Sequence, residues 1–77
     1  MASVSGGVSV GAEWQAAGKT LRDLDLRAAG GAIVLAAVRD GRAIVTPGAG
    51  FTLESNDRLL LLGTETALER TLELLKG

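Results

Sequence analysis

Residues 32–50 read AIVLAAVRDGRAIVTPGAG, and the pattern of this stretch decides the fold that the sequence predicts. Residues 32–38 are all apolar, whereas a strand with one face in water alternates apolar and polar side chains. The dipeptide Asp40–Gly41 is among the strongest signals for a two-residue hairpin turn. The return strand covers residues 42–46 and ends at Pro47, which has no N–H to donate to a sheet. The stretch therefore predicts a hairpin whose first strand is apolar on both faces.

Two further strands and a short helix are predicted around this hairpin. The strands cover residues 8–10 and the continuous apolar run 59–62. The helix begins after Thr20, where Asp23 stands in the spacing of a capping box, and two glycines at residues 30–31 end it.

A last helix begins at Thr64 or Thr66, and its apolar stripe consists of Leu68, Leu72 and Leu75. The resulting order, β-α-β-β-β-α, predicts a small α+β domain with a mixed or antiparallel sheet and both helices on one face. We expect residues 1–7 to be a flexible leader and residues 8–77 to form the domain.

The small size and apolar composition of the chain predict a homodimer. The chain has 77 residues, and 47% of them are hydrophobic. One core in so short a chain contributes only about 3–5 kcal/mol of net stability. Helices can cover one face of the apolar strands, so a second subunit is the simplest cover for the other face. The predicted interface residues are Val34, Ala36, Val38 and Ile44.

Charge and composition disfavour several classes of function. Cysteine and histidine are absent, which excludes disulfides, the common zinc sites and histidine-dependent nucleophiles. The net charge is −1 and the only aromatic residues are Trp14 and Phe51, so we expect no nucleic-acid partner. No apolar run approaches the roughly 20 residues that span a bilayer, and the N-terminus lacks the features of a signal peptide, so we expect a cytoplasmic location.

Motifs that suggest catalysis are incomplete. The Gly48-x-Gly50 spacing has Leu53 where a dinucleotide fingerprint has its third glycine, so we interpret it as a turn. The tripeptide at residues 18–20 lacks the first glycine of a phosphate loop. No carboxylate pair has the spacing or expected burial of an acid/base pair. We therefore predict that the domain is not an enzyme and has no dedicated metal site.

Three arginines, Arg27, Arg39 and Arg42, lie near the end of the short helix and around the hairpin. Planar guanidinium groups suit bidentate binding of phosphate or carboxylate. The alternative is that they pair with nearby aspartates at solvated strand ends.

Several stretches resemble one known family in order along the chain. They are GKTLRDLDLR, the Arg-Asp-Gly hairpin, Pro47, FTLESNDRLLLLGT and the final leucine-rich helix. Together they resemble the RCK C-terminal (TrkA-C) regulatory domain of potassium channels and transporters. Asn56 stands where family members usually have glycine before the aspartate.

The resemblance implies a dimeric regulatory domain on the cytoplasmic side of the cell membrane. Its implied partner is a membrane-embedded cation channel or transporter subunit, in the same or an associated chain, whose transport it gates when a small ligand binds. The ligand implied by relatives is cyclic di-AMP, another nucleotide or a divalent cation. The alternative is a ligand-free dimerisation module of a membrane transporter.

The resemblance also implies a set of ligand residues. This chain has Ala32-Ile33 where binders of cyclic dinucleotides tend to have an asparagine, and Arg42 lies near the position of a histidine that is missing here. A different anion, or no ligand, therefore stays open. The candidate ligand residues are Leu26, Arg27, Ile33, Arg39, Arg42 and Pro47.

Overall fold

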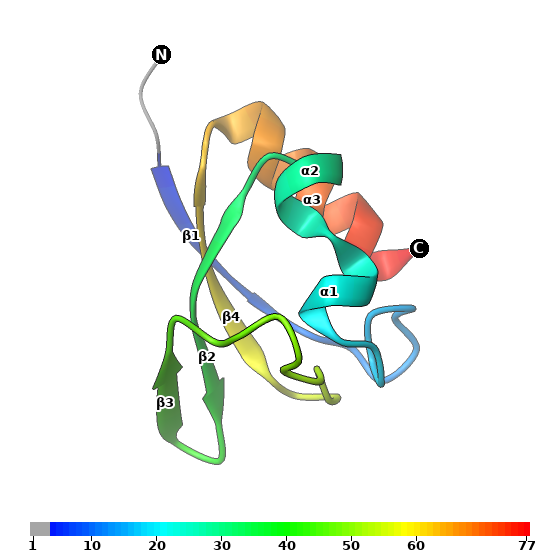
Figure 1. Cartoon of the computed structure of the whole chain (residues 1–77), viewed down its shortest axis with the longest axis vertical. Helices are drawn as coiled ribbons and strands as arrows, with labels where there is room; N and C mark the ends of the chain where they lie inside the picture. The colour runs from blue at the N-terminus through cyan, green and yellow to red at the C-terminus, as the bar shows by residue number, and fades with distance from the viewer. Residues whose placement is uncertain (1–3) are drawn as a thin grey trace.

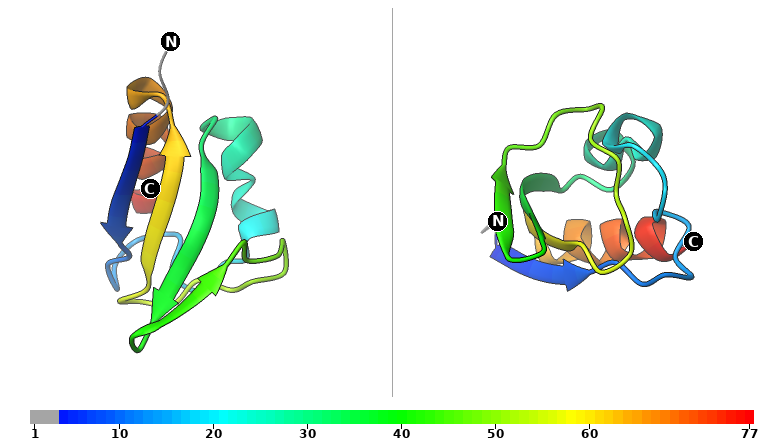
Figure 2. Two further views of the ribbon diagram at one scale, coloured as in Figure 1. Left: turned by 90° about the vertical axis from the view of Figure 1, so that its left-hand side faces the viewer. Right: turned by 90° about the horizontal axis from the view of Figure 1, so that it is seen from below.

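A computed structural model describes residues 4–77, which fold into one sheet and one layer of helices (Figure 1). The elements in chain order are β1 (Val4–Ser9), α1 (Leu21–Leu24), α2 (Leu26–Ala29), β2 (Ile33–Arg39), β3 (Arg42–Val45), β4 (Arg58–Gly63) and α3 (Glu65–Lys76). The four strands pair antiparallel in the order β1-β4-β2-β3. Figure 1 shows all the helices on one side of the sheet, and in the left view of Figure 2 α3 lies behind β1 and β4 while α1 and α2 stand beside β2, so the other face is open. The predicted α+β class and the predicted layers are confirmed.

The predicted hairpin is present with the expected turn. Arg39 lies opposite Arg42 in the register of β2 and β3, so the loop consists of Asp40 and Gly41 alone. Their φ angles are 52° and 77°, and a type I′ turn needs positive φ at both central residues.

Strand β1 begins earlier than the sequence predicts. It pairs with β4 from Val4, opposite Gly63, to Ser9, opposite Arg58. Residues 4–7, which we assigned to the leader, therefore lie in the sheet, whereas residues 1–3 lie outside the described residues. Glycine and serine hide the strand in the sequence because β-propensity is low for glycine.

The first helix is capped as predicted but is broken in the middle. The Thr20 hydroxyl accepts a hydrogen bond from the Asp23 N–H at 3.1 Å. Asp25 then adopts the left-handed conformation, with φ 47° and ψ 49°, and separates α1 from α2. The break turns Leu26 into the core, where it is only 4% exposed.

Helix α3 is continuous and is capped by Thr64, whose hydroxyl accepts from the Ala67 N–H at 3.1 Å. The alternative start at Thr66 is therefore wrong. Of the predicted stripe, Leu75 is buried and Leu68 packs against the core, but the third leucine packed there is Leu74 and not Leu72. Within residues 4–77, no helix combines the length and the apolar character needed to cross a bilayer.

The core lies between the sheet and the helices, and β4 shows how the two faces differ. Leu59 and Leu61 are buried beneath the helices, whereas Leu60 between them is 41% exposed. Directly opposed residues of neighbouring strands point to the same face. The register therefore defines the uncovered surface, which we call the open face; its residues on β2, β3 and β4 are Ile33, Ala36, Val38, Ala43, Val45, Arg58, Leu60 and Leu62.

Candidate functional site

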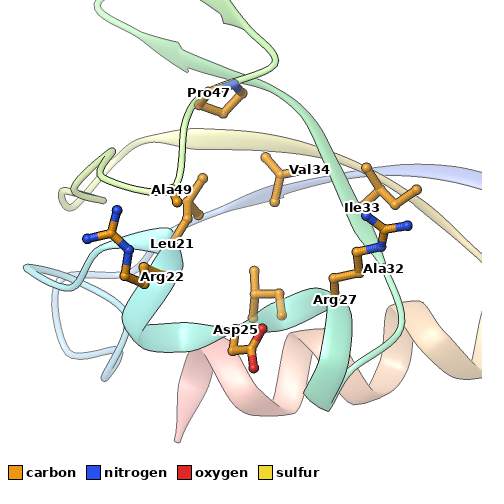
Figure 3. A pocket seen from close by; sticks show the side chains of 10 residues that line it. Leu21, Arg22, Asp25, Arg27, Ala32, Ile33, Val34, Pro47 and Ala49 are labelled. Carbon is orange, nitrogen blue, oxygen red and sulfur yellow. The ribbon is translucent and has the colours of Figure 1, made fainter.

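A cavity of about 570 Å³ lies between the α1–α2 segment and the start of β2 (Figure 3). Pro47 and Ala49, on the chain segment after β3, line its far side. Its lining residues are Leu21, Arg22, Asp25, Leu26, Arg27, Ala32, Ile33, Val34, Pro47 and Ala49.

The cavity has an apolar floor and charged rims. Leu26 and Ala32 are buried in the floor, and Val34 is half-buried beside them. Figure 3 shows the guanidinium groups of Arg22 and Arg27 on opposite sides of the cavity. Within the described part of the chain, neither guanidinium has an ion-pair partner. The site therefore offers two cationic, fork-shaped donors around an apolar surface.

The break at Asp25 brings these two arginines to one cavity. On an unbroken helix with 3.6 residues per turn, positions five apart point about 140° away from each other. The left-handed residue between α1 and α2 changes this direction, so that Arg22 and Arg27 both line the cavity. Gly31, with φ 88°, then returns the chain into β2, and its N–H donates to the carbonyls of Leu26 and Arg27.

Residues 47–51, which we call the wall, are attached to α1 by backbone hydrogen bonds. The Arg22 N–H donates to the Ala49 carbonyl at 2.8 Å, and the Leu21 N–H donates to the Phe51 carbonyl at 3.0 Å. The wall starts after Thr46, whose φ of 45° turns the chain away from β2. Pro47 and Ala49 on the wall line the cavity.

Four of the six predicted ligand residues line this cavity: Leu26, Arg27, Ile33 and Pro47. The structure places Arg39 and Arg42 elsewhere, beside a separate hollow at the hairpin that Asp40 and Ile44 also line. Sequence reasoning missed Arg22, because it assumed one continuous helix. The available signal was Asp25, since aspartate is enriched among the residues that adopt the left-handed conformation.

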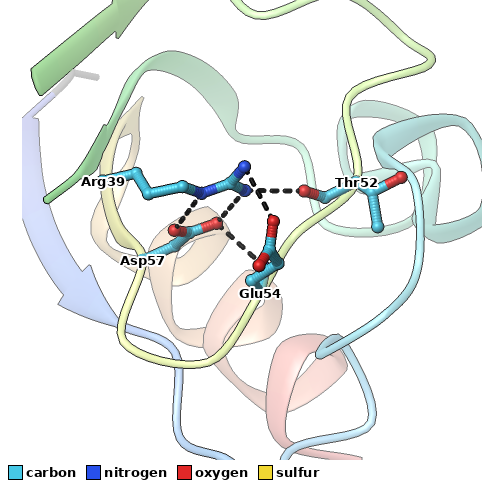
Figure 4. Close-up of polar contacts among 4 residues, drawn as sticks. All are labelled: Arg39, Thr52, Glu54 and Asp57. Atoms are coloured by element: carbon cyan, nitrogen blue, oxygen red, sulfur yellow. Dashed lines mark hydrogen bonds and ion pairs between the residues drawn. The ribbon is translucent and has the colours of Figure 1, made fainter.

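Arg39 forms ion pairs within the protein, but its partners are Asp57 and Glu54 and not the nearby aspartates that the sequence analysis considered (Figure 4). Its Nε lies 2.8 Å from Asp57 Oδ1 and its Nη2 lies 2.6 Å from Asp57 Oδ2. Nη1 lies 2.8 Å from Glu54 Oε2, and Nη2 also donates to the Thr52 carbonyl at 2.9 Å. The guanidinium carbon lies 4.9 Å from the ring centroid of Phe51.

Asp57 is 1% exposed and is compensated on both oxygens. The hydrogen bonds from Arg39 lower the pKa of this carboxyl group, and they outweigh the opposing effect of burial. The same hydrogen bonds raise the pKa of the Arg39 guanidinium above its usual value. Arg39 therefore has an internal structural role rather than a position in the cavity.

The predicted interface residues do not share one face of the sheet. Ala36 and Val38 lie on the open face, whereas Val34 packs against the core. A bulge between Val34 and Ala36 shifts the alternation by one residue, so their two-residue spacing no longer means one face. Ile44 lies opposite the fully buried Ala37 and so points to the helix-covered side.

The TrkA-C domain family model matches residues 8–76. The chain belongs to the TrkA-C (RCK_C) domain family. The resemblance inferred from the sequence is confirmed. A search of curated proteins found no match. Among the described residues of this TrkA-C domain, no group of three or more acidic side chains gathers in a way that could hold a metal ion.

Solved structures similar to this TrkA-C domain support the fold. The RCK_C domain dimer of Streptococcus agalactiae BusR in complex with c-di-AMP is 24% identical with a TM-score of 0.85; the match covers 92% of this chain and 88% of that chain. The RCK C domain of the potassium transport protein KtrA in complex with c-di-AMP is 28% identical with a TM-score of 0.81, over 88% and 78% of the two chains. The GsuK channel bound to NAD is 21% identical with a TM-score of 0.79, over 95% of this chain and 13% of that chain.

One prediction about partners is wrong. BusR in complex with its busAB-promoter DNA is also similar, with a TM-score of 0.85, 24% identity and coverage of 92% of this chain and 35% of that chain. The near-neutral charge of this domain is therefore no argument against a nucleic-acid partner. The physical reason is that the charge of one domain does not limit what other parts of a longer chain bind.

Proposed function

We propose that this TrkA-C domain is the ligand-sensing regulatory module of a potassium or other cation transport system. It acts as a homodimer and binds a small phosphate-bearing ligand in the cavity between α1–α2 and β2. The observation that carries the proposal is the pair of guanidinium groups, from Arg22 and Arg27, on opposite sides of an apolar floor.

The chemistry of the cavity suits a nucleotide. Guanidinium groups bind phosphate through paired, charge-assisted hydrogen bonds, and an apolar floor accepts the face of a base. The volume of about 570 Å³ lies within the range typical of small-molecule sites. Cyclic di-AMP is the first ligand to test, because the similar RCK_C domains of BusR and KtrA are in complex with it.

Binding would regulate transport by shifting the domain between two arrangements. A ligand changes such an equilibrium only by its differential affinity for the two states. In this proposal the domain lies on the cytoplasmic side of the cell membrane, next to a channel or transporter subunit. The gating of that subunit depends on the arrangement of the dimer. Domains from a potassium transport protein and from a channel are among the similar structures, which supports this setting.

Isothermal calorimetry with c-di-AMP, ATP, NAD and Mg²⁺ tests ligand sensing. We expect c-di-AMP or another phosphate ligand to bind, and Arg27→Ala to weaken binding about tenfold or more, since a charged hydrogen bond contributes about 1.5–3 kcal/mol. Arg70→Ala is the matched control, because Arg70 is an exposed arginine on α3 that does not line this cavity. No binding by any member of this panel would contradict ligand sensing.

The open face supports a second candidate function, a ligand-free dimerisation module. Leu60 and Val45 are 41% and 72% exposed there, and no element in residues 4–77 covers them. Obligate dimer interfaces resemble a domain core cut in half, so this face is the surface we assign to the second subunit.

Sedimentation of Leu60→Glu tests the dimer. We expect the wild-type domain to sediment as a dimer at micromolar concentration and Leu60→Glu as a folded monomer. Thr66→Glu, which adds the same charge on the exposed side of α3, is the control and should remain a dimer. A monomeric wild-type protein would contradict both candidate functions as we state them.

A further inference from the structure

The middle of the wall, residues 48–50, has little side-chain packing of its own to hold it in place. Gly48, Ala49 and Gly50 are exposed, and a β-carbon added at either glycine would meet no atom within 4 Å. Glycine also leaves the backbone more conformations than any other residue. Contacts from outside the wall must therefore fix where Pro47 and Ala49 meet the cavity.

Arg39 makes such contacts at the end of the wall that is farthest from Pro47. Its guanidinium lies over the Phe51 ring and donates to the carbonyl of the next residue, Thr52. Phe51 in turn is bonded to the rest of the wall and to α1: its N–H donates to the Gly48 carbonyl at 3.0 Å, and its carbonyl accepts from the Leu21 N–H.

Asp57 fixes the plane of that guanidinium. The two hydrogen bonds between Arg39 and the Asp57 oxygens hold the guanidinium group in one orientation. Asp57 Oδ2 also accepts a hydrogen bond from the Glu54 N–H at 2.9 Å. A buried carboxylate with three such hydrogen bonds is a rigid anchor. The path from Asp57 to the cavity thus runs through Arg39, Phe51 and the backbone of the wall.

We infer that Arg39 and Asp57 are positioning residues for the ligand cavity, which they shape through the wall without lining it. The inference rests on the proposed function for the identity of the ligand. The contacts that hold the wall in position do not depend on any ligand. Lysine at position 39 would keep the charge and lose the fork and the flat contact with Phe51.

The test compares Arg39→Lys and Asp57→Asn with two controls. Glu54→Gln removes the exposed partner of Arg39, and Leu68→Ala weakens the packing of α3 on β1 without touching the wall. Affinity for c-di-AMP is measured by calorimetry at a temperature where each variant is folded. Hydrogen exchange is followed at the amides of Leu21 and Arg22, whose N–H groups donate to the wall.

We expect Arg39→Lys and Asp57→Asn to weaken binding about tenfold, in the range found for residues that act on a site without touching its ligand. Exchange at the Leu21 and Arg22 amides should rise in these two variants relative to β4 amides of the same protein. Both controls should keep the wild-type affinity, and Leu68→Ala should do so despite its lower stability.

Each outcome decides the inference. Arg39→Lys with wild-type affinity and wild-type exchange at Leu21 and Arg22 would overturn it, because the ion pair would then only stabilise the fold. If the wild-type domain binds no ligand, the proposed function fails, and the exchange rates alone decide whether the pair positions the wall. If Arg39→Lys does not fold, Phe51→Leu replaces it, since this change keeps the ion pair and an apolar side chain against the core but removes the ring beneath Arg39.

Discussion

Leu59 and Leu60 are neighbours on β4, yet Leu59 is fully buried beneath the helices and Leu60 is 41% exposed on the open face. Ala37 and Ala36 on β2 repeat the contrast, because each lies opposite one of these leucines in the register. The two faces of the sheet therefore carry similar apolar residues and differ in what covers them. The comparison teaches that an apolar sequence indicates side chains that need to be buried. Within one chain, the position of the helices decides which face of the sheet is buried.

The largest expected effect separates the two faces directly. Leu59→Ala should lower the free energy of unfolding by about 2–5 kcal/mol, since it leaves a cavity in the core. Leu60→Ala should change the stability of the monomer by less than about 0.5 kcal/mol, since it removes an exposed group. Urea denaturation at a concentration where the monomer dominates measures both. Equal losses would mean that the open face is covered within the monomer.

The next effect tests how closely the helical layer is packed. A β-carbon at Gly30 would lie 2.3 Å from Thr71 Oγ1 and 3.0 Å from the Leu26 carbonyl oxygen, so α2 and α3 would have to separate. Gly30→Ala should cost about 1–3 kcal/mol of stability in thermal or urea unfolding. Gly48→Ala is the control, because nothing lies within 4 Å of the added carbon. If Gly30→Ala leaves the stability unchanged, α2 and α3 can move apart at little cost and the close packing at Gly30 is not needed for stability.

The pH dependence tests the anchor at the edge of the covered face. The folded-state pKa of Asp57 lies below its usual value because Arg39 hydrogen-bonds the carboxylate. The folded protein therefore binds fewer protons there, so this stability is present above about pH 4 and is lost as the pH falls further through the folded pKa. Asp57→Asn should flatten the acid limb of a plot of unfolding free energy against pH. Parallel acid limbs for the two proteins would contradict this role of Asp57.

The smallest expected effect is a gain. Thr71 is fully buried on the covered side, and within residues 4–77 its hydroxyl has no hydrogen-bond partner. Thr71→Val keeps the shape and removes the unpaired group, which should stabilise the domain by about 1 kcal/mol. The melting temperature should then rise by about 4–8 °C, as scanning calorimetry would record. A lower melting temperature would show that the hydroxyl is satisfied.

Local signals in the sequence determined much of this protein. Asp40 and Gly41 predicted the hairpin because only a few residue types tolerate positive φ at both turn positions. Thr20 predicted the start of the first helix, and the leucine spacing predicted α3, because caps and helical period depend on residues only a few positions apart. The same local motifs carried the family resemblance.

Tertiary structure decided the features that depend on a single irregular residue or on distant partners. Within the site, Leu26, Arg27, Ile33 and Pro47 were predicted, whereas Arg22 joins them only because Asp25 breaks the helix. The bulge beside Val34 likewise shifted one predicted interface residue to the other face. Arg39 looked like a ligand residue until the fold brought Asp57 to it from eighteen positions along the chain.

The sequence by itself thus determined which strands are apolar on both faces, since that property belongs to the side chains alone. Only the tertiary structure decided which face the helices cover and which arginines line the cavity. The physical reason is that a strand alternates with a fixed period of two, but one bulge or one left-handed residue reverses the alternation or the direction for everything beyond it. A single bulge or left-handed residue costs little conformational free energy where it occurs. The packing of the whole domain therefore determines its position.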